Sequence, residues 1–422
     1  MDSIYVILVN RERRMLTISD YGSYSSWLEI DLGAVVENMR AVQALLCPKV
    51  AICAVVKANA YGHGVAEIAQ AAVKGGAAFL GITSIEEAEK IRKLDSKTRI
   101  LRMMPSNPGE YRWNQILGVD EMVCDLEAAQ RLSELAAQTG SPIRVHVKVD
   151  TGMGRQGVLW ERAVETVFDV ARIRGLRLVG IMTHFAEAPR MGSEFTEIQI
   201  DRFRKILDAL RDRGIRPPYA HAANSAGLMC YANSHFSMVR SGLAIYGISP
   251  VHVNRNLIPL RPVMTAKTRV VQIRRLPAGT TVGYERTYTL SESARVATLS
   301  VGYSDGFPRL LSNRGKVLVG GEERPVIGRV TMNIINVRLE ESDPVSVGDE
   351  VVLMGKQGNR VIHAGDIAQQ LGTIPYEVLT SFGNMSRRVY IEDSEYLKDT
   401  RSFLQTVDFQ ATGRQVVAPH PG

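Results

Sequence analysis

The sequence contains few of the residues that mark a disulfide framework or a structural metal site. Its 422 residues include four cysteines, and no two of them stand in the Cys-x-x-Cys spacing typical of zinc sites. We therefore expect reduced thiols and no bound metal, as in a cytosolic protein. The four cysteines are Cys47, Cys53, Cys124 and Cys230.

Long apolar runs and dense basic runs are also lacking. No segment approaches the roughly 20 apolar residues that a membrane helix needs. The apolar stretch at residues 4–9 is short and follows no basic region, which makes it a poor signal peptide. Basic residues gather only at residues 11–14, without interleaved aromatic residues. The sequence therefore predicts a cytoplasmic protein with neither a membrane nor a nucleic acid as its partner. Its net charge of +7 suits small anionic ligands.

What the sequence does contain is a regular alternation of strand-like and helix-like segments between residues 27 and 260. Eight strand-like runs alternate with helical patterns, which is the count of a (β/α)8 TIM-type barrel; a doubly wound parallel sheet is the alternative. Helix starts are marked by Asp31, by Asp125 and by the capping box of Ser84 and Glu87. The eight runs are 50–56, 78–83, 99–103, 121–124, 143–149, 176–183, 219–223 and 238–244.

The pattern changes near residue 261. Short alternating runs separated by Gly, Pro and Asn predict a mainly β domain over residues 261–395, with a short helix near its end. The barrel domain is expected over residues 27–260, and its first strand, 27–32, is free to pair with the β domain instead. Residues 1–26 are interpreted as an N-terminal extension. Residues 396–422 are polar, carry Gly and Pro, and are expected to form a disordered tail.

The most informative stretch is residues 54–64, AVVKANAYGHG. Its first residues end a β-branched, apolar run that is typical of a buried parallel strand. Lys57 then stands at the carboxyl end of that strand, where desolvation favours the neutral amine that attacks a carbonyl. Tyr61 follows four residues later, so a turn of chain would direct its hydroxyl at the same ligand. For a lone lysine, the ordinary interpretation is a surface residue after a core strand.

This stretch resembles the pyridoxal-phosphate lysine motif of the alanine racemase family. The resemblance implies that Lys57 holds the cofactor pyridoxal 5'-phosphate (PLP) as a Schiff base and that Tyr61 binds its phosphate. It extends, in the family's order, from about residue 27 to residue 391 and so covers both expected domains. The rest of the chain offers further positions at which the resemblance can be tested.

A glycine-rich loop follows the fifth barrel strand at residues 150–157, DTGMGRQG. It contains the dinucleotide pattern Gly-x-Gly-x-x-Gly, but the next strand ends in Thr183 and His184, without the acidic residue that such sites need. The loop instead resembles the family's DTGMGR segment, in which Arg155 helps to bind the substrate carboxylate. Arginine suits that role because its fork donates two hydrogen bonds to a carboxylate. In some family members the lysine matching Lys148 is carbamylated and braces this arginine. The alternative for Arg155 is an ordinary loop arginine on the surface.

Polar residues follow the later barrel strands as well. His184 matches a histidine of the family's active-site hydrogen-bond network, although a single histidine at a strand end is more often structural. Arg240 matches the arginine that faces the pyridine nitrogen of PLP, where aminotransferases generally place a carboxylate. Loops after the seventh and eighth strands are the usual phosphate site of such barrels. There the resemblance implies cofactor contacts from Asn224, Ser225, Gly242 and Leu243.

Three residues of the expected β domain match further functional positions. Tyr303, in the segment GYSDG, matches the second catalytic residue, which reaches the active site of the partner subunit. Tyr376 matches a tyrosine that contacts the phosphate, and Met332 matches one whose backbone N–H helps to bind the substrate carboxylate. The alternative for Tyr303 is a turn tyrosine packed at an interface.

The resemblance implies a PLP-dependent racemase that interconverts L- and D-alanine and supplies D-alanine for cell-wall peptidoglycan. Inversion needs a proton removed from one face of the α-carbon and one returned to the other, which two acid/base groups accomplish most simply. Lys57 would serve one face and the partner subunit's Tyr303 the other, so the active unit is expected to be a homodimer. A PLP-dependent decarboxylase and a non-catalytic PLP-binding protein are the alternatives. The first would present a carboxylate in place of Arg240, and the second would consist essentially of the barrel alone.

One departure from the family pattern concerns substrate range. Residues 331–333 read Thr-Met-Asn, where many members have Cys-Met-Asp. The amide of Asn333 donates hydrogen bonds that a carboxylate cannot donate. This leaves open a broader amino-acid racemase that also accepts serine, beside the interpretation in which residue 333 only shapes a loop.

Overall fold

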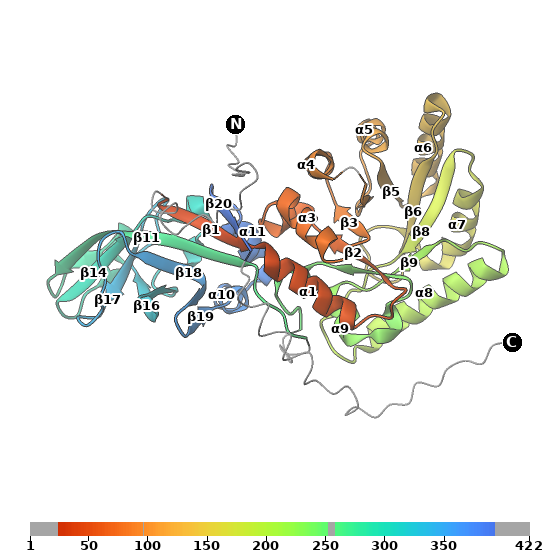
Figure 1. The fold of residues 1–422 in the computed structure, drawn as a ribbon. Helices are drawn as coiled ribbons and strands as arrows, with labels where there is room; N and C mark the ends of the chain where they lie inside the picture. The colour runs from red at the N-terminus through yellow and green to blue at the C-terminus, as the bar shows by residue number, and fades with distance from the viewer. Residues whose placement is uncertain (1–23, 96, 252–257, 393–422) are drawn as a thin grey trace. The chain divides into compact units, whose positions relative to one another are not determined.

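The computed structural model describes residues 24–95, 97–251 and 258–392, which divide into two compact units (Figure 1). The barrel unit consists of residues 30–263 together with the chain from Tyr390 onward. The β unit consists of the chain up to Glu29 together with residues 264–389. The expected N-terminal extension lies outside the described residues except for 24–26, and the expected tail at 396–422 lies outside them entirely. Among the described residues, no helix has both the length and the apolar character that crossing a membrane requires.

Parallel strands form the wall of the barrel unit, in the order β10-β2-β3-β4-β5-β6-β8-β9. Hydrogen bonds from Ser237 N to Ala220 O (3.1 Å) and from Arg240 N to Ala223 O (2.9 Å) connect the β9 and β10 segments, so the ring is nearly closed. Every residue of β3 is buried, which explains why this run is continuously apolar. Every residue of β5 is buried as well, although the strand includes the acidic residues Asp120 and Glu121. The predicted (β/α)8 barrel is confirmed. Its strands are β2 (Ala51–Val55), β3 (Phe79–Ile82), β4 (Arg99–Arg102), β5 (Val119–Val123), β6 (Ile143–Asp150), β8 (Leu176–Met182), β9 (Tyr219–His221) and β10 (Met238–Ser241).

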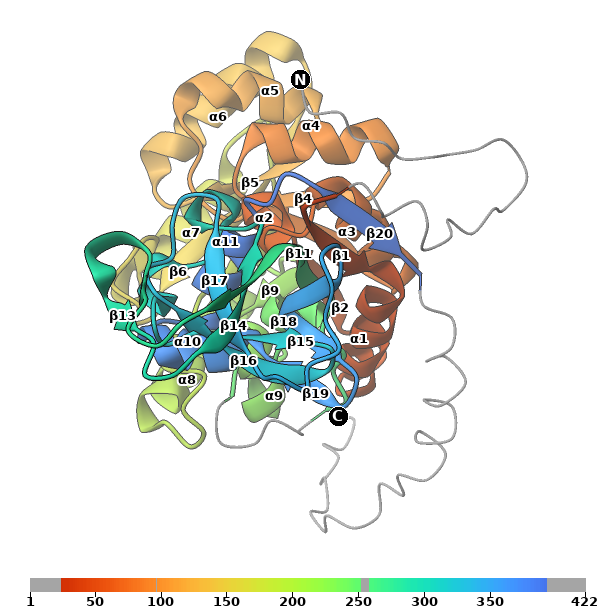
Figure 2. The same cartoon turned by 90° about the vertical axis from the view of Figure 1, so that its left-hand side faces the viewer.

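Helices surround this barrel (Figure 2), and several of them begin at a side-chain cap. Asp31 caps α1, Asp125 caps α6, and Ser84 with Glu87 forms the expected capping box of α4. Each cap satisfies backbone N–H groups that the first helical turn leaves without a partner. The helices are α1 (Leu32–Ala44), α3 (Val65–Lys74), α4 (Ile85–Leu94), α5 (Tyr111–Ile116), α6 (Leu126–Thr139), α7 (Ala163–Arg172), α8 (Glu194–Asp212) and α9 (Ser225–Cys230).

The β unit is built on a sheet with the order β19-β18-β15-β16-β17-β14-β11-β1-β20. Its pairings from β11 to β19 are antiparallel, in keeping with the short alternating runs of the sequence. The strand β1 lies between β11 and β20 in this order, so the first predicted strand belongs to this sheet. The strands are β1 (Ser26–Asp31), β11 (Met264–Leu276), β14 (Ala294–Leu299), β15 (Lys316–Val319), β16 (Glu322–Ile327), β17 (Ile335–Leu339), β18 (Glu350–Gln357), β19 (Arg360–Ile362) and β20 (Arg388–Ile391).

The last two barrel strands end earlier than the sequence pattern predicts, at residue 221 instead of 223 and at residue 241 instead of 244, and two short helices were not predicted. The strand β9 ends at His221 because Asn224 already caps α9, and β10 ends at Ser241 because Gly242 turns the chain with φ −109° and ψ −94°. The unpredicted helices are α2 (Lys57–Tyr61) and α11 (Pro375–Phe382), which accompanies the predicted α10 (Ala364–Leu371).

Candidate active site

Lys57 opens an unusual turn at the carboxyl end of β2. The four residues after it, at positions 58–61, have φ between 52° and 54°, in the left-handed region. This conformation costs a non-glycine residue roughly 1–2 kcal/mol. None of the four is a glycine, so the surrounding structure must hold the turn in place. Strained segments of this kind are concentrated at functional sites.

The amine of Lys57 lies where its neutral form is favoured. Burial, the largest cause, and the positive charge of Arg155 lower the pKa of Lys57, whereas the carboxylate of Glu87 acts in the opposite direction. The net direction is downward, so more of this amine is unprotonated near neutral pH than for an exposed lysine. A neutral amine can attack a carbonyl or accept a proton.

Three residues singled out from the sequence come together in the barrel unit. The Ser225 hydroxyl accepts hydrogen bonds from Gly242 N (2.8 Å) and Ala244 N (3.3 Å). A Cβ added to Gly242 would lie 2.7 Å from the hydroxyl oxygen of Tyr61, so that hydroxyl approaches the backbone closely. The hydroxyl of Ser241, the residue before Gly242, is buried without a hydrogen-bond partner. Hydroxyl and backbone N–H groups after the last barrel strands are typical of a phosphate site, so these residues fit the phosphate of PLP.

Two further residues expected to contact the cofactor flank this cluster. Asn224 caps α9 by accepting a hydrogen bond from Gly227 N (2.9 Å), and Leu243 begins a short 3₁₀ helix after Gly242. The sequence analysis missed Tyr246 at the end of that helix. Its ring centre lies 4.8 Å from that of Tyr61, and its hydroxyl donates to Val55 O (2.9 Å). Tyr246 therefore packs Tyr61 against the end of β2.

Arg240 is 3% exposed and is surrounded by hydrogen-bond acceptors. Its guanidinium donates to the carbonyl oxygens of Thr183 (2.7 Å), Ala222 (2.8 Å) and His221 (3.0 Å). It also lies 3.0 Å from His221 Nδ1 and 3.2 Å from His184 Nδ1. Because arginine can only donate, both nitrogens must accept, and the ring proton of each histidine is on Nε2. Burial first, and Arg240 second, lower the pKa of both histidines well below its ordinary value, so both rings are neutral.

A column of buried polar side chains continues from Arg240 through the barrel. His221 Nε2 lies 2.9 Å from His146 Nδ1, and His146 Nε2 lies 3.6 Å from the Asp120 carboxylate. Since His221 carries its proton on Nε2, it donates to His146, whose own proton then faces Asp120. We call Arg240, His221, His146 and Asp120 the polar column. Donor meets acceptor from Arg240 to His146, and the proton on His146 is directed at the Asp120 carboxylate from 3.6 Å, which is beyond hydrogen-bond distance.

The sequence analysis did not identify this column, although one signal was available. His146 and Lys148 are two residues apart in β6, so both side chains lie on the same face of that strand. A Cβ added to Gly180 on the neighbouring β8 would lie 2.0 Å from His146 Nδ1. The histidine ring therefore occupies space that only glycine leaves open.

Arg155 belongs to the loop after β6, which the carboxylate of Asp150 organises. That carboxylate accepts hydrogen bonds from three successive backbone N–H groups at residues 152–154, with distances of 2.7 to 2.9 Å. Arg155 follows this turn and is exposed. It lies near enough to lower the pKa of Lys57, so its charge is available at the Lys57 end of the barrel.

Lys148 is a buried amine, 1% exposed, that donates to Val149 O (3.0 Å). Burial first, and then the charge of Arg240, lower the pKa of Lys148 to about 7. A substantial fraction of the amine is therefore neutral at physiological pH, and a neutral amine is the form that reacts with carbon dioxide. This environment fits a lysine that is open to carbamylation.

In the β unit, Tyr303 and Met332 lie on adjacent segments. Tyr303 N donates to Thr331 O (3.0 Å), and Ser304 N donates to Met332 O (3.0 Å). Tyr303 is 43% exposed and Met332 is 54% exposed. Tyr376, in the first turn of α11, belongs to the same unit, whereas the candidate residues described above belong to the barrel unit.

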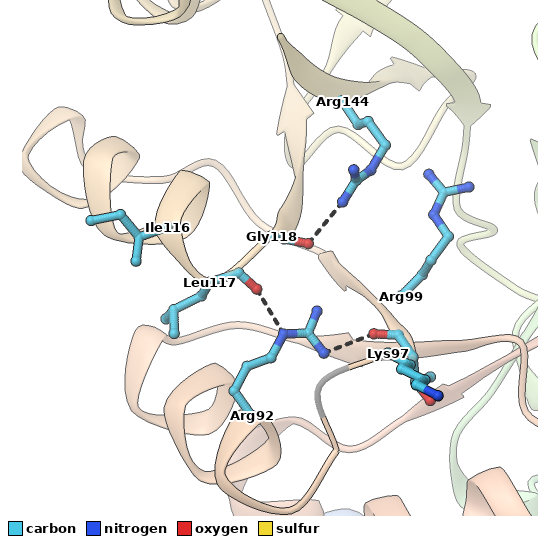
Figure 3. Close-up of a pocket in the computed structure, with 8 residues that line it drawn as sticks. Arg92, Lys97, Arg99, Ile116, Leu117, Gly118 and Arg144 are labelled. Carbon is cyan, nitrogen blue, oxygen red and sulfur yellow. Dashed lines mark hydrogen bonds between the residues drawn. The ribbon is translucent and has the colours of Figure 1, made fainter. Parts of the chain in front are cut away.

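A basic cavity of about 460 Å³ lies at the amino ends of β4, β5 and β6 (Figure 3). Arg92 and Arg144 donate there to backbone carbonyl oxygens at 2.7 to 2.9 Å. Arg99 and Arg144 also bind the carboxylate of Asp120, the last member of the polar column. These arginines thus bind backbone carbonyl groups of the loops and one buried carboxylate, so we interpret their role in the cavity as structural. In the part of the chain that the structure describes, no group of three or more His, Cys, Asp or Glu residues is placed to hold a metal ion.

Comparison with known proteins covers both units. The family models for the alanine racemase N-terminal and C-terminal domains match residues 30–250 and 263–390. The alanine racemase of Symbiobacterium thermophilum is 40% identical over 370 residues, which are 87% of this chain and 98% of that protein. The structure of alanine racemase from Streptomyces coelicolor A3(2) matches with a TM-score of 0.82 and 35% identity, over 89% of this chain and 100% of that one. Alanine racemase from Bartonella henselae, described with covalently bound pyridoxal phosphate, matches with a TM-score of 0.78 and 27% identity, over 87% and 100% of the two chains. With both of its units matched and in the same order, the chain belongs to the alanine racemase family.

Proposed function

We propose that this protein interconverts L- and D-alanine with PLP held by Lys57. The observation that carries the proposal is the cluster of Tyr61, Ser225 and Gly242, which offers hydroxyl and backbone groups to a phosphate close to the Lys57 turn. The relatives named above are alanine racemases, which supports alanine as the substrate. PLP, when bound, would draw negative charge away from the α-carbon and so make its proton easier to remove.

Different residues of the chain would bind the cofactor and the substrate. Lys57 would attach the cofactor, and Tyr61 with Ser225 would hold its phosphate. Arg240 would face the ring nitrogen, and because a guanidinium donates hydrogen bonds and accepts no proton, that nitrogen would stay unprotonated. A decarboxylase would be expected to present a carboxylate there, so Arg240 favours the racemase. Arg155 would bind the substrate carboxylate.

Two residues would exchange protons with the α-carbon. The Lys57 amine, whose pKa is lowered chiefly by burial, accepts a proton on one face. The hydroxyl of the partner subunit's Tyr303 would serve the opposite face, and the exposure of Tyr303 and Met332 suits residues that act in another copy of the chain. For the reverse reaction the two roles are exchanged. The active species is then a homodimer.

Borohydride reduction tests the role of Lys57. The purified protein should be yellow, and reduction should fix the cofactor to Lys57, as located by mass spectrometry of the digested chain. The exposed Lys74 serves as an internal control and should remain unmodified. An adduct on any other lysine would contradict the proposal. Incubation with L-alanine should then yield D-alanine, whereas carbon dioxide would indicate a decarboxylase and no product a non-catalytic PLP-binding protein.

A further inference from the structure

The left-handed turn that carries Lys57 is tied to the next strand by one buried carboxylate. Asn59 N, inside the turn, donates a hydrogen bond to Glu87 Oε1 (3.0 Å). The other oxygen, Glu87 Oε2, accepts hydrogen bonds from Thr83 N (2.9 Å) and Ser84 N (3.2 Å). Glu87 is 7% exposed, so water competes little for these contacts. One side chain thus joins the turn after β2 to the segment between β3 and α4.

The turn forms several backbone hydrogen bonds of its own, but it leaves the Asn59 N–H to a side chain. Its internal bonds include those from Ala60 N to Val56 O (2.8 Å) and from Gly62 N to Ala58 O (3.1 Å). The Asn59 N–H is given to Glu87 instead, while the Asn59 side chain accepts from Val65 N (3.0 Å) at the start of α3. A hydrogen bond to an ionised carboxylate is about twice as strong as a neutral one, which helps to offset the strain of four left-handed residues.

Helix capping explains only part of this arrangement. In a capping box, the acidic residue at the third helical position reaches back to the N–H of the cap residue, here Ser84. That contact uses Glu87 Oε2, whereas Glu87 Oε1 is directed at Asn59 in a different segment. The negative charge of Glu87 also acts on the Lys57 amine, in the direction that retains its proton. Glu87 is therefore coupled to Lys57 both mechanically and electrostatically.

We propose that Glu87 is a positioning residue for Lys57. Through Asn59 it fixes the turn that presents the Lys57 amine and the Tyr61 hydroxyl, and without it both groups lose their alignment while the rest of the barrel remains folded. Glu87 acts through the backbone and does not touch the substrate. The inference rests on the proposed role of Lys57 in the reaction.

The test compares Glu87→Gln with Glu89→Gln. Glutamine keeps the volume of Glu87 but loses the charge and replaces one acceptor by a donor that cannot receive a backbone N–H. Glu89 is an exposed acid on the same helix, α4, and is the matched control. Hydrogen exchange in peptides covering residues 57–65 should become at least about tenfold faster in Glu87→Gln. Its kcat for L-alanine should fall roughly 10- to 100-fold, because a displacement of about 1 Å has that effect, with KM within about threefold of the control.

A second variant tests whether the loss passes through the turn. Ala58 is exposed and has φ 52°, a conformation that glycine adopts without strain. Adding Ala58→Gly to Glu87→Gln should therefore restore kcat about threefold or more, because the turn then needs less support. A purely electrostatic or purely capping role of Glu87 would give no such recovery. If Glu87→Gln alone proves too unstable to purify, the double variant can be compared with Glu89→Gln in its place.

Three outcomes would overturn the inference. Exchange and kcat of Glu87→Gln within about twofold of the Glu89→Gln values would show that the turn does not depend on Glu87. Faster exchange with unchanged kcat would show that order in the turn is not needed for the reaction. Lower kcat without faster exchange would show that Glu87 acts by another route. If borohydride places the cofactor away from Lys57, the proposed function fails, while the exchange measurement still decides whether Glu87 holds the turn.

Discussion

Burial has different consequences for the lysines and the arginine of the active site. It lowers the pKa of Lys148 to about 7 and is the main cause of the lowered pKa of Lys57. The pKa of Arg240 falls only to about 10, although burial is again the first cause. At neutral pH the lysines can therefore act as neutral amines, while Arg240 remains a fixed positive donor. Burial thus suits the proton exchange proposed for Lys57, and it leaves Arg240 a constant hydrogen-bond donor.

We predict that Lys148 is carbamylated, because its lowered pKa leaves part of the amine neutral. The neutral amine attacks carbon dioxide, loses a proton and becomes an anion, which the nearby charges of Arg240 and Arg155 would stabilise. Protein equilibrated with ¹³C-labelled bicarbonate should show one carbamate signal by NMR, weaker below pH 7, where the amine becomes protonated. Lys148→Met should lose that signal and raise KM for L-alanine by roughly tenfold or more, since Arg155 loses an anionic partner. Lys74→Met, at an exposed position, is the control; a signal that survives in Lys148→Met would refute this assignment.

Asn333 offers a test of substrate range. Its side chain is exposed and donates a hydrogen bond to Ser304 Oγ (2.8 Å), beside the Tyr303 segment. Asn333→Asp removes this donor, and we expect the ratio of kcat/KM for L-serine to that for L-alanine to fall about two- to tenfold, the worth of one hydrogen bond. Asn359→Asp, at an exposed position between β18 and β19, is the control. A ratio that does not fall in Asn333→Asp would mean that this residue does not set specificity.

At the scale of elements, the site depends on the close meeting of the Lys57 turn with the segment after β10. Gly242→Ala would put a methyl group 2.7 Å from the Tyr61 hydroxyl oxygen and so push the two segments apart. Such overpacking typically costs about 1–3 kcal/mol, so the Kd for PLP should rise about tenfold or more. Titration of the cofactor-free protein, followed by absorbance, measures it. Gly365→Ala, where an added Cβ meets nothing within 4 Å, should bind PLP normally. Equal affinity in the two variants would contradict the proposed phosphate site.

The sequence predicted the elements whose cause is local. Barrel strands such as β2 and β3 were recognisable because strands buried on both faces tend to be continuously apolar. The helix starts were recognisable because caps such as Asp31, Ser84 and Asp125 satisfy free N–H groups. Side chains after the strands were predicted as site residues because parallel strands bring their carboxyl ends together. The meeting of Tyr61, Ser225 and Gly242 in the structure follows from this rule. Their functional roles stay predictions.

The features that the sequence did not reveal depend on distant partners. Of the residues Ala-Asn-Ala-Tyr, only Asn favours the left-handed region, so the sequence does not signal a four-residue turn there. One of its hydrogen-bond partners, Glu87, lies on another element. The polar column likewise joins β5, β6, β9 and β10. Burial lowers the pKa of both of its histidines, and contact with Arg240 fixes the ring proton of His221. The sequence pattern predicted that β10 would end at residue 244, three residues too late, because the apolar run continues past Gly242 although the backbone turns there.

At the scale of the whole molecule, the proposed reaction needs residues from both units. The α-carbon must be reached from two faces, and the two proposed bases lie in different units, Lys57 in the barrel unit and Tyr303 in the β unit. The segments around Tyr303 and Met332 expose large apolar side chains, including that of Ile334, which is 43% exposed. Exposed apolar side chains gathered in this way commonly mark a protein–protein contact. A second copy of the chain is the partner that would place a Tyr303 hydroxyl at each Lys57.

Complementation between two inactive variants tests this shared site. Lys57→Ala and Tyr303→Phe should each lose roughly 10²- to 10⁴-fold in kcat, the usual worth of one positioned acid/base group. In a mixed dimer, one site carries both substitutions, and the other has an intact Lys57 and receives an intact Tyr303. Coexpression with two affinity tags should therefore recover about a quarter of the native activity, since about half of randomly formed dimers are mixed and each has one working site. Two differently tagged Lys57→Ala chains, coexpressed in the same way, provide the control and should remain inactive. Mixed dimers that are isolated on both tags and show no racemisation would mean that each chain completes its own site.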